Sequence, residues 1–135
     1  PFNYPLGCKG RFLKLSKFKL IPKIYIIDDN YIIMDYIDGI PLKKLLPELN
    51  EDNQEWEEKI SPGKAHNLWL KIDETLEEFH RISKSAHGDL NPGNILVSKD
   101  LDKIWFIDPS CESTNYYRDE DNMRRIKYLL LSEYD

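Results

Sequence analysis

Residues 87–94 read HGDLNPGN, and this polar loop decides the fold because the segments on its two sides have different apolar patterns. Before the loop, residues 61–82 begin with a Ser-Pro pair and place apolar side chains at the three-and-four spacing of a helix. After the loop, residues 95–97 and 104–107 are short apolar runs separated by a polar turn. We expect a long helix, a loop and a hairpin in this order.

The hairpin would bring together residues that are distant in the chain. Its strands run antiparallel, so Asn94, just before the first strand, and Asp108, just after the second, emerge at the same end. Asp89 lies in the preceding loop, five positions before Asn94. Oxygen ligands of this kind suit Mg²⁺, which also retains waters and binds substrate phosphates. We therefore expect Asn94 and Asp108 to be metal ligands.

Phosphoryl transfer needs this set of groups. Metal ions neutralise the charge that develops on the phosphate oxygens, while a separate carboxylate accepts or orients the proton of the attacking hydroxyl. Asp89 is the candidate for that second task. Each residue also has a structural explanation, because Asp and Asn stabilise turns in many proteins. Their coincidence at one hairpin end is what favours a catalytic site.

The loop also resembles a known motif, because an Asp followed five residues later by Asn is the spacing of the kinase catalytic loop. Gly88 after the His is similar to small-molecule and atypical kinases. Asp108-Pro109 is similar to fructosamine and related sugar kinases of the aminoglycoside-phosphotransferase-like group, and Arg118-Asp119 resembles a pair in the RIO kinases. The chain is thus identified as a member of the protein-kinase-like superfamily, in its atypical or small-molecule branch.

A second match lies upstream, where residues 32–39 resemble the last N-lobe strand and the hinge of this superfamily. The resemblance implies that Met34, Asp35, Tyr36 and Ile37 bind the nucleotide. Met34 would be the gatekeeper, the Asp35 carbonyl would accept a hydrogen bond from adenine, and the Ile37 N–H would donate one.

The resemblance, which covers about 100 of the 135 residues, implies a single α+β domain of protein-kinase-like fold. Residues 1–37 would be a truncated N-lobe, consisting of a β-hairpin and the hinge strand. Residues 38–135 would be a mainly helical C-lobe with the catalytic loop and the metal-binding hairpin. The implied cofactors are ATP and Mg²⁺, and the implied reaction transfers the γ-phosphate to a hydroxyl of a small molecule, a sugar or a protein.

Parts of a kinase are missing from this pattern. The sequence shows no glycine-rich loop, no strand lysine for the phosphates and no glutamate before residue 48 to pair with that lysine. Three explanations remain open: a fragment of a longer kinase, which Pro1 in place of Met favours; a degenerate kinase that binds without turnover; or another use of an N-terminal lysine. The alternative function is therefore an inactive kinase-like module associated with RNA or protein.

Charge is distributed unevenly along the chain. The first 23 residues carry +6, and the remainder carries −11 of the net charge of −5. A basic arm of this kind can bind nucleic acid, but lysines along a short amphipathic helix more often form its solvated face. No apolar run is long enough to span a bilayer and no secretory signal is visible, so we expect a cytoplasmic protein without a membrane partner.

Other features give narrower expectations. Cys8 and Cys111 are predicted to be free thiols, and His87 to be a loop-packing residue. Asp119 is either the cap of a final helix or an anchor for the catalytic loop. The remaining predicted elements are a short helix over 11–18, a hairpin over 23–27 and 31–36, a brief helix within 42–49, a loop over 50–59 and a final helix after Asp119.

Overall fold

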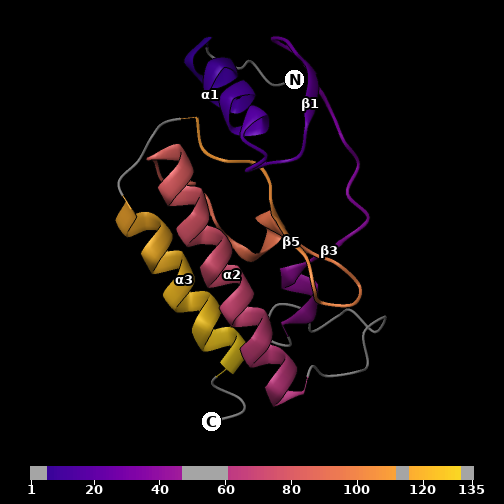
Figure 1. Ribbon diagram of the computed structural model, residues 1–135, viewed down its shortest axis with the longest axis vertical. Helices are drawn as coiled ribbons and strands as arrows, with labels where there is room; N and C mark the ends of the chain where they lie inside the picture. Colours follow the sequence, from indigo (N-terminus) through magenta and orange to yellow (C-terminus); the bar gives the residue numbers. More distant parts are fainter. Residues whose placement is uncertain (1–5, 47–60, 112–115, 132–135) are drawn as a thin grey trace.

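The computed structural model describes residues 6–46, 61–111 and 116–131, so the loop predicted over 50–59 lies outside the described residues. Figure 1 shows a long helical pair below a smaller part that contains α1 and β1, with short strands between them. The elements, in chain order, are α1 (Leu6–Lys17), β1 (Ile24–Ile27), β2 (Ile32–Met34), β3 (Ile40–Pro41), η1 (Leu42–Leu45), α2 (Pro62–Ser83), η3 (Pro92–Asn94), β4 (Ile95–Val97), β5 (Ile104–Phe106) and α3 (Tyr116–Leu131).

Helix α1 begins earlier than the sequence pattern predicts. Its buried face consists of Cys8, Phe12 and Leu15, which recur at the spacing of one helical face, so the face extends beyond the segment 11–18. The helix ends where Lys19 takes a left-handed conformation with φ 62°, three residues before Pro22.

The β1–β2 hairpin confirms the predicted pair of antiparallel strands, with Ile27 opposite Ile32. The Asp28 carboxylate closes the turn, because it accepts hydrogen bonds from the N–H groups of Asn30 at 2.8 Å and Tyr31 at 3.0 Å. The hairpin packs beside α1, where the Ser16 hydroxyl accepts a hydrogen bond from the Ile24 N–H at 2.8 Å.

Helix α2 confirms the predicted boundaries of the long helix. Ser61 is its N-cap, and the Ser61 hydroxyl accepts a hydrogen bond from the Lys64 N–H at 3.3 Å. Lys84 ends the helix in a left-handed conformation. Helix α3 lies alongside α2 and runs in the opposite direction (Figure 1), and it buries Met123, Ile126 and Leu130, which recur at the spacing of one helical face.

The second sheet contains the predicted hairpin and one further strand. Its order is β3-β4-β5, with Leu96 opposite Trp105 on one side and Ile40 opposite Val97 on the other. Gly39 lies directly before β3, and a Cβ there would come within 3.2 Å of the Val97 carbonyl oxygen. The absence of a side chain at Gly39 thus lets the segment after β2 pass close to β4.

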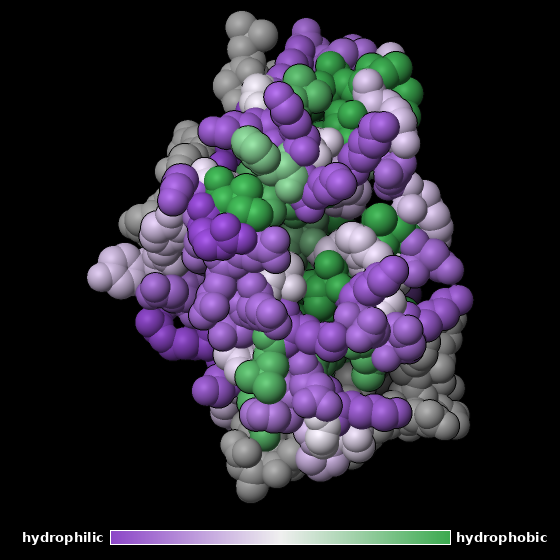
Figure 2. Space-filling model, in the orientation of Figure 1, coloured by the Kyte–Doolittle hydropathy of each residue, from purple (hydrophilic) through white to green (hydrophobic). Residues whose placement is uncertain are grey.

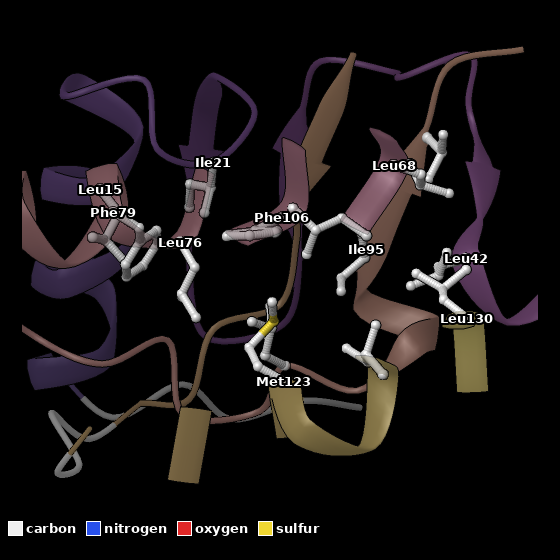
Figure 3. Packing of buried hydrophobic residues seen from close by; sticks show 14 of the residues in the cluster. Leu15, Ile21, Leu42, Leu68, Leu76, Phe79, Ile95, Phe106, Met123 and Leu130 are labelled. Carbon is white, nitrogen blue, oxygen red and sulfur yellow. The ribbon is translucent and has the colours of Figure 1, made fainter. Parts of the chain in front are cut away.

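One core joins these elements. Figure 3 shows side chains from α1, α2, both strands of the β4–β5 hairpin and α3 in a single apolar layer. Phe79 of α2 and Phe106 of β5 are among its largest fully buried members, with ring centroids 6.1 Å apart. The start of the loop 87–94 rests on this core, because the His87 ring packs against Phe79 and Phe106.

The face shown in Figure 2 is largely hydrophilic, with green apolar patches at the end that holds α1 and β1 and further green patches near the centre and lower on the same face. The exposed apolar side chains there include Leu13, Phe18, Ile26 and Ile33. Among the described helices, none combines the length and apolar character needed to cross a membrane.

The prediction of two free thiols is wrong. Cys8 of α1 and Cys111 are joined in a disulfide, with their Cα atoms 4.5 Å apart. The sequence did not indicate this pairing because the two residues are 103 positions apart and their proximity is created by packing of α1 against the chain beyond β5.

Candidate active site

The loop 87–94 is held at its start by a buried carboxylate. Asp119, in the first turn of α3, accepts a hydrogen bond from the His87 N–H at 2.7 Å and another from the Gly88 N–H at 2.9 Å. The same carboxylate lies 2.7 Å from the His80 Nε2 of α2. Since Asp119 lies inside α3 and binds the loop, it is an anchor and not a cap.

The surroundings of Asp119 favour the charged form of its carboxyl group. Burial by itself would raise the pKa of the Asp119 carboxyl, but the hydrogen bonds from His80 and from the Gly88 and His87 N–H groups hold that pKa below its ordinary value. Asp119 is therefore ionised at neutral pH, and the charged carboxylate strengthens the two backbone hydrogen bonds that it accepts.

His87 connects the loop to the far strand of the hairpin. Its Nδ1 accepts a hydrogen bond from the Asp89 N–H at 3.2 Å, so the ring proton is on Nε2, which donates to the Ile107 carbonyl at 2.8 Å. Burial between Phe79 and Phe106 lowers the pKa of His87. The predicted packing role is confirmed, and the ring also fixes the residue next to Asp108.

The Asp89 carboxylate is held by two amides. The Asn94 Nδ2 donates to the Asp89 carbonyl at 2.8 Å and lies 3.3 Å from the Asp89 Oδ2. The Asn91 Nδ2 lies 3.2 Å from the Asp89 Oδ1. Because Asn94 uses its NH₂ group on Asp89, its side-chain oxygen is the atom that it can offer to a cation.

Asp108 lies at the same hairpin end. The Ile107 N–H donates to the Asn94 carbonyl at 3.0 Å and thereby ties the two ends of the hairpin together. Asp108 has a φ of 50°, a left-handed conformation that costs a non-glycine residue energy and is common at functional sites. Partial loss of hydration raises the pKa of Asp108, and the nearby Asp89 charge raises it further. The structure thus brings Asp89, Asn94 and Asp108 together.

The side-chain oxygens of Asp89, Asn94 and Asp108 suit a hard divalent cation. Two carboxylates whose charges repel each other, with an amide oxygen beside them, are stabilised by a cation that accepts oxygen ligands. Among the described residues no group of three or more His, Cys, Asp and Glu side chains is arranged to hold a metal ion. Mg²⁺ does not need such a cage, because it binds through one or two protein oxygens together with phosphates and waters.

The predicted hinge follows β2 and leads into the second sheet. The Asp35 N–H donates to the Lys23 carbonyl at 2.8 Å, and the Gly39 N–H donates to the Ile37 carbonyl at 2.9 Å. Across the described ranges, no hydrogen bond engages the Asp35 carbonyl or the Ile37 N–H, the two groups expected to pair with adenine. Met34 packs against the core, whereas Tyr36 is 86% exposed.

A groove of about 630 Å³ touches this segment at Asp35 and Ile37 and continues along Lys17, Lys19 and Lys23. Its lining includes none of Asp89, Asn94 and Asp108. The groove therefore borders the predicted hinge but does not reach the three residues at the hairpin end.

Sequence reasoning missed one residue of this region. Arg11 of α1 is one of the basic residues among the first 23, and its guanidinium reaches the segments on both sides of the site. The partners of Arg11 lie 74 to 99 positions further along the chain, so no local pattern could have revealed them.

Comparisons with known proteins place this geometry in a family. A model of the RIO domain matches residues 11–123. The kinase domain of PknI from Mycobacterium tuberculosis is a similar solved structure, with 15% identity and a TM-score of 0.62 over 93% of this chain and 59% of that chain. Another is the maize sucrose-induced receptor kinase 1 domain bound to AMP-PNP, with 21% identity and a TM-score of 0.56 over 78% and 38%. No match was found among curated proteins.

These likenesses confirm the predicted fold class, an α+β protein-kinase-like fold. The chain spans only part of these structures: 59% of the length of the PknI kinase domain and 38% of the length of the maize domain.

Proposed function

The chain belongs to the RIO domain family, and from this premise we propose that it forms the catalytic and metal-binding core of an ATP- and Mg²⁺-dependent phosphotransferase. The reaction transfers the γ-phosphate of ATP to a hydroxyl group. The observation that carries the proposal is the meeting of Asp89, Asn94 and Asp108 at one end of the β4–β5 hairpin.

Asp89 is the proposed catalytic residue. Its carboxylate is exposed, and Asn91 and Asn94 orient it by one amide contact to each of its two oxygens. The remaining lone pairs of these oxygens can face an incoming hydroxyl. In this position Asp89 would orient the hydroxyl and accept its proton as the new bond to the γ-phosphorus forms and the bond from that phosphorus to the departing ADP breaks.

Asn94 and Asp108 are the proposed ligands of Mg²⁺, through the side-chain oxygen of Asn94 and the carboxylate of Asp108. When bound, Mg²⁺-ATP supplies the phosphoryl group and neutralises the charge that develops on its oxygens. The hydrogen bond between Ile107 and Asn94 fixes the spacing of the two ligands in advance.

Met34, Asp35, Tyr36 and Ile37 are the proposed adenine site. The backbone of this segment offers an acceptor at Asp35 and a donor at Ile37, and the β3 pairing attaches the segment to the strand that follows Asn94. The adenine and phosphate ends of a nucleotide would then be bound by one continuous piece of structure.

We further propose a small molecule or sugar, rather than a protein, as the acceptor. The support comes from Gly88 after His87 and from Pro109 after Asp108, because the small-molecule kinases that this chain resembles have similar residues at these two positions. A chain without turnover is the second candidate, favoured by the absence from the sequence of a glycine-rich loop and of a glutamate before residue 48.

Nucleotide titration tests the proposal. Mg²⁺-ATP at about 100 times its dissociation constant should stabilise the native state by roughly 2.7 kcal/mol, measured as a rise in the unfolding temperature. Asp108→Ala should remove the Mg²⁺-dependent part of this rise. An unchanged unfolding temperature in the wild type, together with no effect of Asp108→Ala, would contradict a nucleotide site.

The chemical step has its own test. Asp89→Asn should lower phosphate transfer by about 100- to 10,000-fold and leave nucleotide affinity nearly unchanged, because the variant loses only the proton acceptor. The matched control is Asp102→Asn, an exposed carboxylate at the opposite end of the same hairpin. Turnover retained by the Asp89 variant would exclude that residue as the base, and turnover absent from the wild type would favour the binding module.

A further inference from the structure

Arg11 bridges the two segments that carry the candidate site. Its Nε donates to the Ser110 carbonyl at 3.0 Å, and its Nη1 donates to the Ser85 hydroxyl at 2.7 Å. Its Nη2 donates to the Ala86 carbonyl. Ser110 lies two residues after Asp108, and Ala86 lies three residues before Asp89. A single side chain from α1 thus holds the entry to the loop and the exit from the hairpin.

The two segments also contact each other at this point. The Ser110 N–H donates to the His87 carbonyl at 2.9 Å. Ser110 therefore binds the loop through its N–H and Arg11 through its carbonyl. On the other side, the His87 N–H is bound by Asp119. Partial burial lowers the pKa of Arg11, and the negative charge of Asp119 opposes part of this shift.

The chemistry of the bridge requires arginine. A guanidinium has five N–H donors in a rigid planar fork and can serve three acceptors at once from fixed directions. A lysine ammonium is a compact charge on a flexible stem and lacks this planar geometry. The contact with three acceptors from two chain segments is therefore more specific than a charge at this position.

A covalent link reinforces the same contact. Cys8 precedes Arg11 by one helical turn and is joined to Cys111, the residue after Ser110. Cys8 and Arg11, which are one turn apart on α1, thus hold Cys111 and Ser110, two successive residues that follow the β4–β5 hairpin.

We propose that Arg11 is a positioning residue that sets the separation of Asp89 and Asp108, with the Cys8–Cys111 disulfide as a second fastening of the same segment. The catalytic consequence rests on the proposed function, whereas the local structural consequence does not. Helix α1 then contributes to the geometry of the site through Arg11 and Cys8.

Hydrogen exchange of the ligand-free 135-residue chain tests the structural part. Arg11→Met should speed exchange of the His87, Gly88 and Ser110 amides by roughly 10- to 100-fold, the loss expected for hydrogen bonds to a charged donor. Exchange in the middle of α2 should not change. Arg11→Lys should restore little protection, because it keeps the charge without the fork.

Two further variants keep this test decisive. Lys14→Met, the matched control, removes a positive charge one turn along the same helix and should change nothing at these amides. If Arg11→Met does not fold, Ser85→Ala removes a single bond of the bridge and should give a fivefold to tenfold effect at the same amides. Uniformly faster exchange along the chain, or full rescue by Arg11→Lys, would overturn the proposal.

The two fastenings can be separated with Cys111→Ala. Because both act on the same short segment, combining this change with Arg11→Met should speed Ser110 exchange by more than the product of the two single effects. Independent effects that simply multiply would show that the disulfide and Arg11 do not hold one unit.

The catalytic part is tested separately by kinetics. If wild-type transfer is observed, Arg11→Met should lower kcat at least tenfold and change the nucleotide KM much less, because the loss is in the alignment of Asp89 with Asp108. A change confined to KM would contradict positioning. If the wild type shows no transfer, the proposed function fails while the exchange result still decides the role of Arg11.

Discussion

At the scale of a single residue, burial keeps the His87 ring in the neutral form that its two hydrogen bonds require. Its ring joins the Asp89 N–H to the Ile107 carbonyl only in the neutral form with the proton on Nε2. Protonation would put a second proton on Nδ1 and break the bond from Asp89. The low pKa of the buried ring keeps this from happening near neutral pH.

This pKa gives a pH dependence of stability. The unfolded chain binds a proton at His87 near pH 6.5 and the native state does not, so the stabilisation is complete above about pH 6.5. It is lost as the pH falls toward the lower native pKa, with a slope of up to about 1.4 kcal/mol per pH unit. Urea unfolding at pH 7.5 and 5.5 should show the loss in the wild type.

Two variants test whether His87 causes this pH dependence of the free energy of unfolding. His87→Gln should remove it, whatever its effect at pH 7.5. His66→Gln changes an exposed histidine of α2 and should keep it. An unchanged slope in the His87 variant would mean that another group causes the pH dependence.

Helix α3 combines packing and anchoring at the scale of an element. Ile126 and Leu130 bury its apolar face, while Asp119, fully buried at its start, supplies the acceptor for two N–H groups of the loop. The position of the loop is therefore set by the docking of α3 against α2, and a helix distant from the loop in the chain decides the geometry of the candidate site.

Removing the anchor should be costly. Asp119→Ala leaves two buried N–H groups without an acceptor and should lower the free energy of unfolding by about 3 kcal/mol, measured by urea unfolding at pH 7. The matched control is Asp121→Ala, which removes an exposed carboxylate paired with Arg124 on the same helix and should cost less than about 0.5 kcal/mol. Equal losses in the two variants would contradict the anchoring role.

At the scale of the whole molecule, the Cys8–Cys111 disulfide connects the beginning of the described chain to the segment beyond β5. It closes a loop with a sequence separation of 103 residues and so restricts the unfolded chain more than the folded one. Reduction should lower the free energy of unfolding by about 4 kcal/mol, measured by urea unfolding with and without a phosphine reductant.

Cys111→Ala provides the control. The variant should be as unstable as the reduced wild type, because Cys111 is largely exposed and its own burial contributes little. Added reductant should not destabilise the variant further. A wild type that is insensitive to the reductant would show that the disulfide does not constrain the unfolded state.

Local patterns were sufficient for most of the elements, but not for β3 or for the start of α1. Ser61 and Pro62 predicted the start of α2, the polar turn predicted the β4–β5 hairpin, and the positions of Asn94 and Asp108 followed from antiparallel pairing. The order of these motifs indicated the α+β kinase-like fold that the structural likenesses confirm. The roles of Asp89, Asn94, Asp108 and the hinge residues stay predictions.

The sequence by itself determined helix α2, the β4–β5 hairpin and the residues that the hairpin end brings together, because each depends on contacts between neighbours in the chain. Only the tertiary structure decided that Asp119 anchors the loop, that Cys8 meets Cys111 and that Arg11 bridges both sides of the site. The physical reason is that these contacts join positions 31 to 103 residues apart, where packing of whole elements creates the proximity.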